Sequence, residues 1–161
     1  MKIRVDRKNN SASVRIDGVM GDSSAKELHA LSEIKSASEI GFDFEKLEMI
    51  NSMGAHAWTK FIQSIAGDVR IRFERCPTFF VDFGNIAHQF FGHGIVASLY
   101  IPFLCDECGN RFLRLYTRDQ LAELVGDFAL PCGKCAKKAD SEVFLDDFLM
   151  AVRRQDHGSQ K

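Results

Sequence analysis

Long apolar runs are missing from this 161-residue sequence, and its formal net charge is only −1. No window reaches the roughly 20 apolar residues that a membrane-spanning helix needs, and the opening MKIRVDRKNN has no signal-peptide core. We therefore expect a cytoplasmic protein without membrane insertion. Charge is also balanced locally, because residues 1–103 carry 12 basic and 12 acidic side chains and residues 104–161 carry 9 and 10. This balance disfavours nucleic-acid binding, which typically needs a basic surface.

Arrangements that carry enzyme chemistry are missing as well. We find no nucleophile placed beside a base, no Gly-rich loop that would cradle a phosphate, and no metal site with an open coordination position. The sequence therefore predicts a non-enzymatic protein. Tryptophan and tyrosine are scarce, with one and two residues, whereas 14 phenylalanines and 45% hydrophobic residues predict well-filled apolar cores.

Cysteine is present in an odd number, and its spacing predicts a metal site. Two CxxC pairs, with 23 residues between them, suit one tetrahedral zinc ion held by four thiolates in a structural zinc ribbon; the ligands would be Cys105, Cys108, Cys132 and Cys135. A redox-active dithiol is the alternative for one pair. Four cysteine ligands leave no position for a substrate, so a catalytic zinc is not expected. The fifth cysteine, Cys76, is predicted to be a small buried apolar residue.

Hydrophobic periodicity predicts alternating strands and helices in the first two thirds of the chain. The order β-β-α-β-α-β-α-β indicates an α/β fold, with a mixed sheet covered by helices. A capping box of Ser24 and Glu27 is expected to open the first helix. The third helix, from Pro77, is expected to bury one face. The expected strands are 2–6, 12–17, 39–44, 68–73 and 95–104, and the face of the third helix comprises Phe79, Phe83, Ile86 and Phe90, widened by Phe80, Ala87 and Phe91.

The chain is organised around one strand-to-helix connection in residues 40–66. An apolar strand passes through Leu47, Met49 and Ile50 to Asn51-Ser52-Met53-Gly54, after which the period changes to that of a helix. The buried face of this helix would carry Trp58, Phe61, Ile62 and Ile65. Asn51 and Ser52 are both good N-cap residues, and one of them is expected to close the first turn. The helix N-terminus would favour an added negative charge there.

This stretch resembles the core signature of STAS domains, the fold of anti-sigma factor antagonists. In that family an apolar strand ends in Asp-Leu, and Asp-Ser-Ser/Thr-Gly-Leu later opens a helix. Asp43-Phe44 and residues 51–55 (NSMGA) stand at those places. Gly18-Val19-Met20 is similar to the family's Gly-x-Leu/Ile segment, and Cys76-Pro77 to its later strand–helix junction. The resemblance covers residues 1–103 and implies a STAS-like mixed sheet and a protein-interaction function.

Within the family, Ser52 matches the serine that partner kinases phosphorylate. The resemblance implies a bacterial signalling module that binds a kinase-type anti-sigma factor or a larger signalling complex through Asp22, Asn51, Met53 and Gly54. Asn51 replaces the family's aspartate, Met53 and Ala55 replace Ser/Thr and Leu, and the acidic residue at Asp22 is displaced by one. Two alternatives therefore stay open: Ser52 is a helix cap and no more, or the chain is a cytosolic STAS subunit of a lipid or solute transporter complex.

Residues 104–161 form the predicted second domain, after a STAS-like domain over residues 1–103. Beyond the first CxxC, residues 111–116 alternate like a strand, and Thr117 with Gln120 is expected to cap a short helix. Phe112 and Phe128 would form a small ribbon core. A final helix is expected from Asp140-Ser141, with an apolar face that must pack on the ribbon, on the sheet domain or on a second chain. Homo-oligomers are compatible with the sequence. Nucleic-acid binding through the ribbon is the third alternative, and the charge balance disfavours it.

Overall fold

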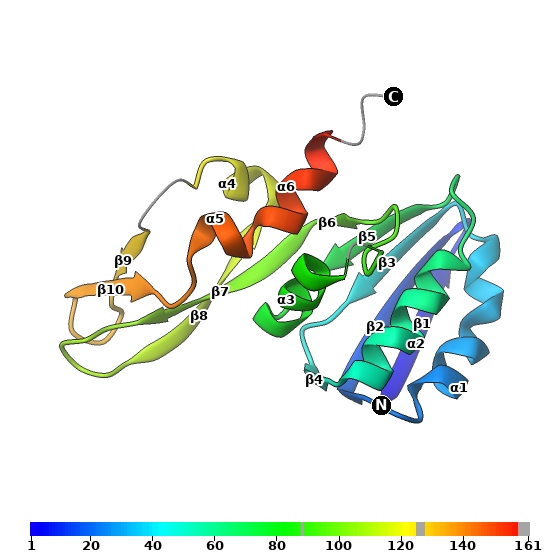
Figure 1. Cartoon of the computed structure of the whole chain (residues 1–161), viewed down its shortest axis with the longest axis horizontal. Coiled ribbons are helices and arrows are strands. Elements are labelled where there is room, and N and C mark those ends of the chain that lie inside the picture. The colour runs from blue at the N-terminus through cyan, green and yellow to red at the C-terminus, as the bar shows by residue number, and fades with distance from the viewer. Residues whose placement is uncertain (88, 125–127, 158–161) are drawn as a thin grey trace.

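The computed structural model describes residues 1–87, 89–124 and 128–157, and it confirms a mixed α/β fold. The described strands form a six-stranded sheet of order β1-β2-β3-β5-β6, with β4 paired to β2, and a four-stranded sheet of order β8-β7-β10-β9. The two sheets lie end to end along the long axis of the molecule (Figure 1). No helix in the described residues is long and apolar enough to cross a membrane.

The first sheet combines an antiparallel hairpin with parallel strands. Strands β1 (Lys2–Lys8) and β2 (Ser11–Met20) pair through a turn in which Asn9 has a φ of +55°. Strands β3 (Glu39–Asp43), β5 (Arg70–Glu74) and β6 (Ile95–Val96) add in parallel, and β4 (Leu47–Ile50) pairs in parallel with the last residues of β2. Alternate β2 side chains are buried, so the strand has one apolar and one polar face.

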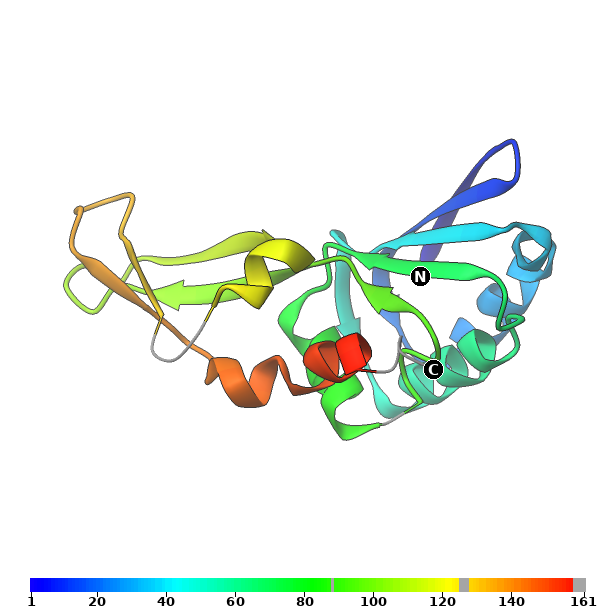
Figure 2. The ribbon, with the colours of Figure 1, turned by 90° about the horizontal axis from the view of Figure 1, so that it is seen from above.

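The helices cover one face of this sheet (Figures 1 and 2). They are α1 (Ser24–His29) with a following 3₁₀ segment (Ala30–Ser36), α2 (Ser52–Gln63) and α3 (Thr78–Ile86). Trp58 of α2 is fully buried and meets Phe42 edge-on at 5.1 Å between ring centroids. Its indole N–H donates to the carbonyl of Phe90 at 3.1 Å. The predicted buried face of α2 is confirmed, since Trp58, Phe61, Ile62 and Ile65 are all buried.

Two predictions about the helices of the first 103 residues are wrong. Ser24 is not a cap: it lies inside α1, is buried, and its hydroxyl accepts the backbone N–H of Gly21 at 2.8 Å. The face of α3 is also misassigned, because Ile86 is 81% exposed whereas Phe80 and Gly84 are buried. The ring of Phe91 packs directly on Gly84, where a Cβ atom would come within 2.0 Å of it. The absence of a side chain at Gly84 thus decides which face of α3 turns inward.

The predicted strand over residues 95–104 is two strands that belong to different sheets. Strand β6 ends at Val96 in the first sheet, and β7 (Ser98–Leu104) begins the second after Ala97. Strand β8 (Arg111–Thr117) pairs with β7 over its whole length, and β10 (Lys138–Ser141) joins β7 to β9 (Ala129–Pro131). The sheets therefore change at Ala97. The domain division after residue 103 stays a prediction.

The C-terminal segment packs on α3, as its apolar face requires. The predicted helix start at Asp140-Ser141 is wrong, because these residues belong to β10 and pair with β7. Helices α5 (Leu145–Phe148) and α6 (Met150–His157) follow, and Leu145, Phe148, Leu149 and Val152 are buried. The Asn85 amide of α3 donates to the Phe148 carbonyl at 2.9 Å and accepts the Ala151 N–H at 2.8 Å. The Asn85 side chain thus forms hydrogen bonds with backbone groups on both sides of the break between α5 and α6.

Candidate functional site

The N-terminus of α2 presents the predicted partner surface, and two close contacts position it. The Asn51 side chain caps the helix by accepting the Gly54 N–H at 2.8 Å, and its amide donates to Asp22 at 3.2 Å. Gly54 lies directly against β2, where a Cβ atom would be 2.2 Å from the Met20 carbonyl oxygen. Glycine is therefore required at this position. Of the two cap candidates, Asn51 is the N-cap and Ser52 is the first helical residue.

Ser52 lies exposed on this surface. The cap does not use its hydroxyl, and Asn51 separates it from Asp22 along the surface. Apolar side chains lie at the same end of the sheet: Val19 and Met49, partners in the β2–β4 pairing, are 40% and 49% exposed, and Met53 is 58% exposed. We call Val19, Asp22, Met49, Ser52 and Met53 the α2 surface. It combines exposed apolar side chains with an exposed hydroxyl and an exposed carboxylate.

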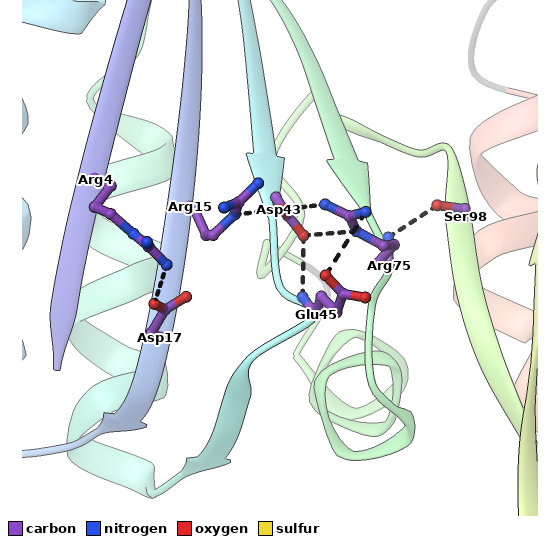
Figure 3. Close-up of polar contacts among 7 residues, drawn as sticks. All are labelled: Arg4, Arg15, Asp17, Asp43, Glu45, Arg75 and Ser98. Carbon is purple, nitrogen blue, oxygen red and sulfur yellow. Dashed lines mark hydrogen bonds and ion pairs between the residues drawn. The ribbon is translucent and has the colours of Figure 1, made fainter.

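A charged network around Asp43 lies where β3 and β5 end (Figure 3). The Asp43 carboxylate is buried and accepts hydrogen bonds from Arg15 Nε at 2.9 Å, from Arg75 Nε at 2.9 Å and from Arg75 Nη2. Arg75 has a φ of +52°, and its backbone N–H donates to the Ser98 hydroxyl of β7 at 2.8 Å. The network therefore joins β2, β3 and β5 to the first residue of the second sheet.

Electrostatics hold Asp43 ionised. Burial raises the pKa of the Asp43 carboxyl, but the hydrogen bonds from Arg75, the Glu45 N–H and Arg15 outweigh burial and place the pKa below its ordinary value of 3.8. The Glu45 carboxylate is the fourth charged group of this network, because it lies 3.7 Å from Arg75 Nη1. Both acids in this group, Asp43 and Glu45, have a cation beside them, so the network links the ends of the strands by ion pairs.

The four predicted metal ligands converge at the far end of the second sheet. Cys105 and Cys108 lie in the turn between β7 and β8, and Cys132 and Cys135 in the turn between β9 and β10. Their sulfur atoms all lie within 4.8 Å of one another, with Cys105–Cys135 at 3.5 Å and Cys108–Cys132 at 3.7 Å. Sulfurs bound at about 2.3 Å around a tetrahedral ion are about 3.8 Å apart. The donor set therefore fits a metal ion.

Local donors already favour the thiolate form of one ligand. The backbone N–H groups of Lys134 and Cys135 lower the pKa of the Cys132 thiol to about 6. The Lys134 N–H lies 3.4 Å from the Cys132 sulfur, and the Asn110 amide approaches the same sulfur at 3.6 Å from the other turn. Each turn is closed in the same way, by Gly109 N–H to the Cys105 carbonyl and by Ala136 N–H to the Cys132 carbonyl, both at 2.8 Å. Such N–H···S contacts are typical of thiolates that bind metals.

The predictions for Cys76, for the aromatic core of the second sheet and for the Thr117–Gln120 capping box are confirmed. Cys76 is fully buried, and burial raises its thiol pKa well above the ordinary value, so it is an apolar packing residue. Phe112 stacks on Phe103 at 5.5 Å, and Phe128 meets Phe103 and Tyr116 edge-on, which confirms the small aromatic core of the second sheet. The Thr117–Gln120 capping box is also confirmed.

Comparison with solved structures gives a likeness of fold to part of the chain. No family model matches the chain, and no curated protein matches its sequence. The solved structure of the anti-sigma factor antagonist SpoIIAA in its unphosphorylated form is similar to part of the chain. That match has a TM-score of 0.35 and 16% sequence identity, and it covers 45% of this chain and 72% of the other.

Proposed function

We propose that the protein is a non-enzymatic regulatory module of the anti-sigma-factor-antagonist type, acting in the cytoplasm, whose STAS-like part binds a protein partner through the α2 surface. The observation that carries the proposal is the exposed Ser52 hydroxyl beside Met53 at the start of α2, with the cap made by Asn51 instead. Because the cap does not need the Ser52 hydroxyl, the hydroxyl is free for modification without loss of the helix. The partner in this proposal is a kinase-type anti-sigma factor or a related signalling protein.

Phosphorylation of Ser52 would change the α2 surface through charge. A phosphate adds a charge of about −2 at neutral pH. The Asn51–Asp22 contact of 3.2 Å brings a carboxylate to the same end of α2, so two negative groups would then share this surface. Docking of Val19, Met49 and Met53 against apolar partner atoms would require this charge to lose water, which is unfavourable. Phosphorylation is therefore expected to weaken partner binding, although the helix N-terminus itself tolerates the charge.

For the second sheet we propose one structural Zn²⁺ bound by Cys105, Cys108, Cys132 and Cys135. Four thiolate donors in a roughly tetrahedral arrangement favour zinc over the harder cations Mg²⁺ and Ca²⁺. The ion would join the β7–β8 turn to the β9–β10 turn and so fix the outer end of the sheet. Binding of nucleic acid remains disfavoured by the charge balance of residues 104–161.

A second candidate function is a cytosolic STAS subunit of a membrane transporter complex. It is favoured by Asn51 and Met53, which stand where the antagonist signature has aspartate and Ser/Thr. In that role the α2 surface would dock permanently on another subunit, and Ser52 would stay unmodified. The two functions differ in what a charge at Ser52 does.

The deciding experiment is affinity capture from the native host with wild type, Ser52→Ala and Ser52→Asp, followed by identification and quantification of the bound proteins. We expect a kinase or sensor-type protein on wild type and Ser52→Ala, with at least a tenfold loss on Ser52→Asp. Ser11→Asp is the matched control, because Ser11 is exposed at the opposite end of β2. Capture of the same transporter subunits by all variants would replace the first function with the second.

A further inference from the structure

The two cysteine turns of the second sheet have the same backbone hydrogen bonds. In each turn the N–H of the first cysteine donates to the carbonyl of the residue that closes the turn, Cys105 to Asn110 at 3.0 Å and Cys132 to Lys137 at 2.7 Å. The backbone N–H of that closing residue donates to the sulfur of the second cysteine. Asn110 and Lys137 therefore occupy equivalent positions, one in each turn.

The side chains at these two positions differ. The Asn110 side chain is half-buried, and its amide nitrogen crosses to the other turn, where it donates to the Cys132 sulfur at 3.6 Å. Lys137 is exposed, and within the described part of the chain its side chain makes no reciprocal contact with the first turn. Asn110 thus reaches three of the four predicted ligands, two through its own backbone and one across the site through its side chain.

The Cys132 sulfur receives two kinds of donor. The Lys134 N–H at 3.4 Å belongs to the same turn, so it comes with the backbone conformation of that turn. The Asn110 amide comes from 22 residues earlier in the chain, and strands β8 and β9 lie between the two residues. The Asn110 contact is therefore a connection between the two turns that does not depend on the metal.

A donor at this sulfur matters because the predicted site is rich in negative charge. Four thiolates around one divalent cation leave an excess of negative charge on the sulfurs, and N–H groups stabilise it. The first turn adds two exposed acidic side chains, Asp106 and Glu107, between its cysteines. An amide N–H at position 110 stabilises the charged Cys132 sulfur, whereas a carboxylate there would repel it.

We propose that Asn110 is a positioning residue of the metal site, whose side-chain amide directs the Cys132 sulfur toward the ion and connects the two cysteine turns. The inference rests on the Zn²⁺ site proposed above and adds to it a residue that is not a ligand. Zinc binding by the four cysteines does not itself require this amide, so the two proposals can fail separately. The amide orients Cys132 before the ion binds and stabilises its thiolate afterwards.

The first test is the zinc affinity of the full chain, measured by competition with a chromophoric chelator. The loss of an outer hydrogen bond to a ligand typically lowers metal affinity by roughly 10–100-fold, and we expect a loss of this size in Asn110→Ala. Asn110→Asp has nearly the same shape as the wild type but places a carboxylate beside the sulfur, so its loss should be larger. Lys137→Ala is the matched control at the equivalent position of the other turn, and it should keep an affinity close to that of the wild type.

A spectroscopic readout separates a hydrogen bond to the sulfur from a general effect on the turn. With Co²⁺ in place of Zn²⁺, sulfur-to-metal charge transfer gives an absorption band whose energy depends on the electron density at the sulfurs. Removal of the Asn110 N–H raises that density, so the band should move to longer wavelength in Asn110→Ala and stay in place in Lys137→Ala. The spectrum is recorded on the metal-loaded protein, so it decides the test even if a variant loses structure without metal.

The outcomes distinguish this proposal from the zinc site itself. A wild type that binds no zinc would overturn both. Unchanged affinity and cobalt spectra in the two Asn110 variants would overturn the role of Asn110 and leave the zinc site intact. An affinity that falls while the cobalt band stays in place would show a structural effect on the turn and would also overturn that role. So would a Lys137→Ala variant that lowers the affinity and shifts the band as much as Asn110→Ala does.

Discussion

At the scale of single residues, Gly54 shows how one missing side chain sets the position of a helix. The chain passes from β4 into α2 so close to β2 that a Cβ atom at Gly54 would meet both the Met20 carbonyl and the Gly21 nitrogen, at 2.2 Å and 3.0 Å. The contact is with backbone, which cannot rotate away as a side chain can. Ser52 and Met53, the two residues before Gly54, owe their exposed positions to this close approach.

Gly54→Ala should therefore destabilise the protein, although glycine to alanine in a helix is ordinarily favourable by about 1 kcal/mol. The forced movement of α2 from β2 should cost roughly 2–3 kcal/mol, as overpacking typically does. Urea unfolding measures the difference. Gly67→Ala is the control, since a Cβ atom there meets nothing within 4 Å, and its effect should stay within about 0.5 kcal/mol. Equal stability of the two variants would contradict the close contact.

Asp43 should make stability depend on acid. Its pKa is lowered in the folded protein, so the ionised form contributes stability above the ordinary pKa of 3.8. That contribution is lost as the pH falls below this value and through the lowered one, because the unfolded chain binds the proton more tightly. Chemical unfolding of wild type between pH 2 and pH 7 should show this loss. Asp43→Asn should be less stable at neutral pH but less sensitive to acid, and an unchanged acid dependence would contradict the assignment.

Some of these residues could be predicted from the sequence, and others could not. The four cysteine ligands can be predicted because a metal-binding CxxC turn has a short, fixed spacing. Asn51 and Ser52 can be predicted as cap candidates because they precede the point where the hydrophobic pattern changes from that of a strand to that of a helix. Only Asp43 of its network was noticed, and only through family resemblance. Its partner Arg75 is 32 residues away in the sequence and has a left-handed backbone conformation. No local sequence pattern predicts the pairing or this conformation.

At the scale of elements, two predictions fail for the same reason: the buried face of α3 and the single strand over residues 95–104. In both, the apolar pattern does not show which neighbouring element a side chain packs against. Apart from Thr78, Asp82 and Asn85, the residues of α3 are apolar or glycine. Periodicity therefore could not show that Gly84 faces Phe91 and that Ile86 faces solvent. The strand pattern of 95–104 continues unbroken through Ala97, although the chain changes sheets there. Alternation reports which side chains turn inward, and it does not report which sheet they join.

In the contact between α3 and the C-terminal segment, Asn85 makes two hydrogen bonds to the backbone around the break between α5 and α6. Asn85→Ala would leave the Phe148 carbonyl and the Ala151 N–H without their partner, at a cost of about 1–3 kcal/mol. Hydrogen exchange of residues 145–157 should become faster in this variant, while that of β1–β3 changes little. Asn10→Ala, in the exposed turn after β1, is the control and should leave both regions unchanged. Uniform acceleration across the chain would show that the segment does not open on its own.

At the scale of the whole molecule, the two sheets share one hydrophobic cluster that runs from Ala12 to Val152 among the described residues. The fold class followed from the order of elements, since it depends only on local patterns. The way the sheets join did not, because it depends on packing between α3, α5 and α6. The metal site is the part of this assembly that lies farthest from α2 (Figure 1).

Removal of the metal should therefore have a graded effect. The purified protein is expected to contain about one zinc ion per chain, and Cys132→Ser or a chelator should release it. Exchange should then accelerate most in residues 105–110 and 129–141 and least in the first sheet. Cys76→Ala, which changes a buried cysteine outside the cluster, should keep the ion. Zinc retained by Cys132→Ser, or simultaneous loss of both sheets, would contradict this division.

The junction at Ala97 also restricts how the length of the chain can change. The Cys76 N–H donates to the Ser98 carbonyl at 3.0 Å, and the Tyr100 N–H to the Cys76 carbonyl at 2.9 Å, so β7 starts in a fixed phase relative to β5. Inserting one residue between Val96 and Ser98 would turn Leu99, Ile101 and Phe103 to the solvent face, because side chains alternate along a strand. A one-residue insertion or deletion at Ala97 should therefore disrupt the second sheet, because the position of Ala97 sets which β7 side chains face inward.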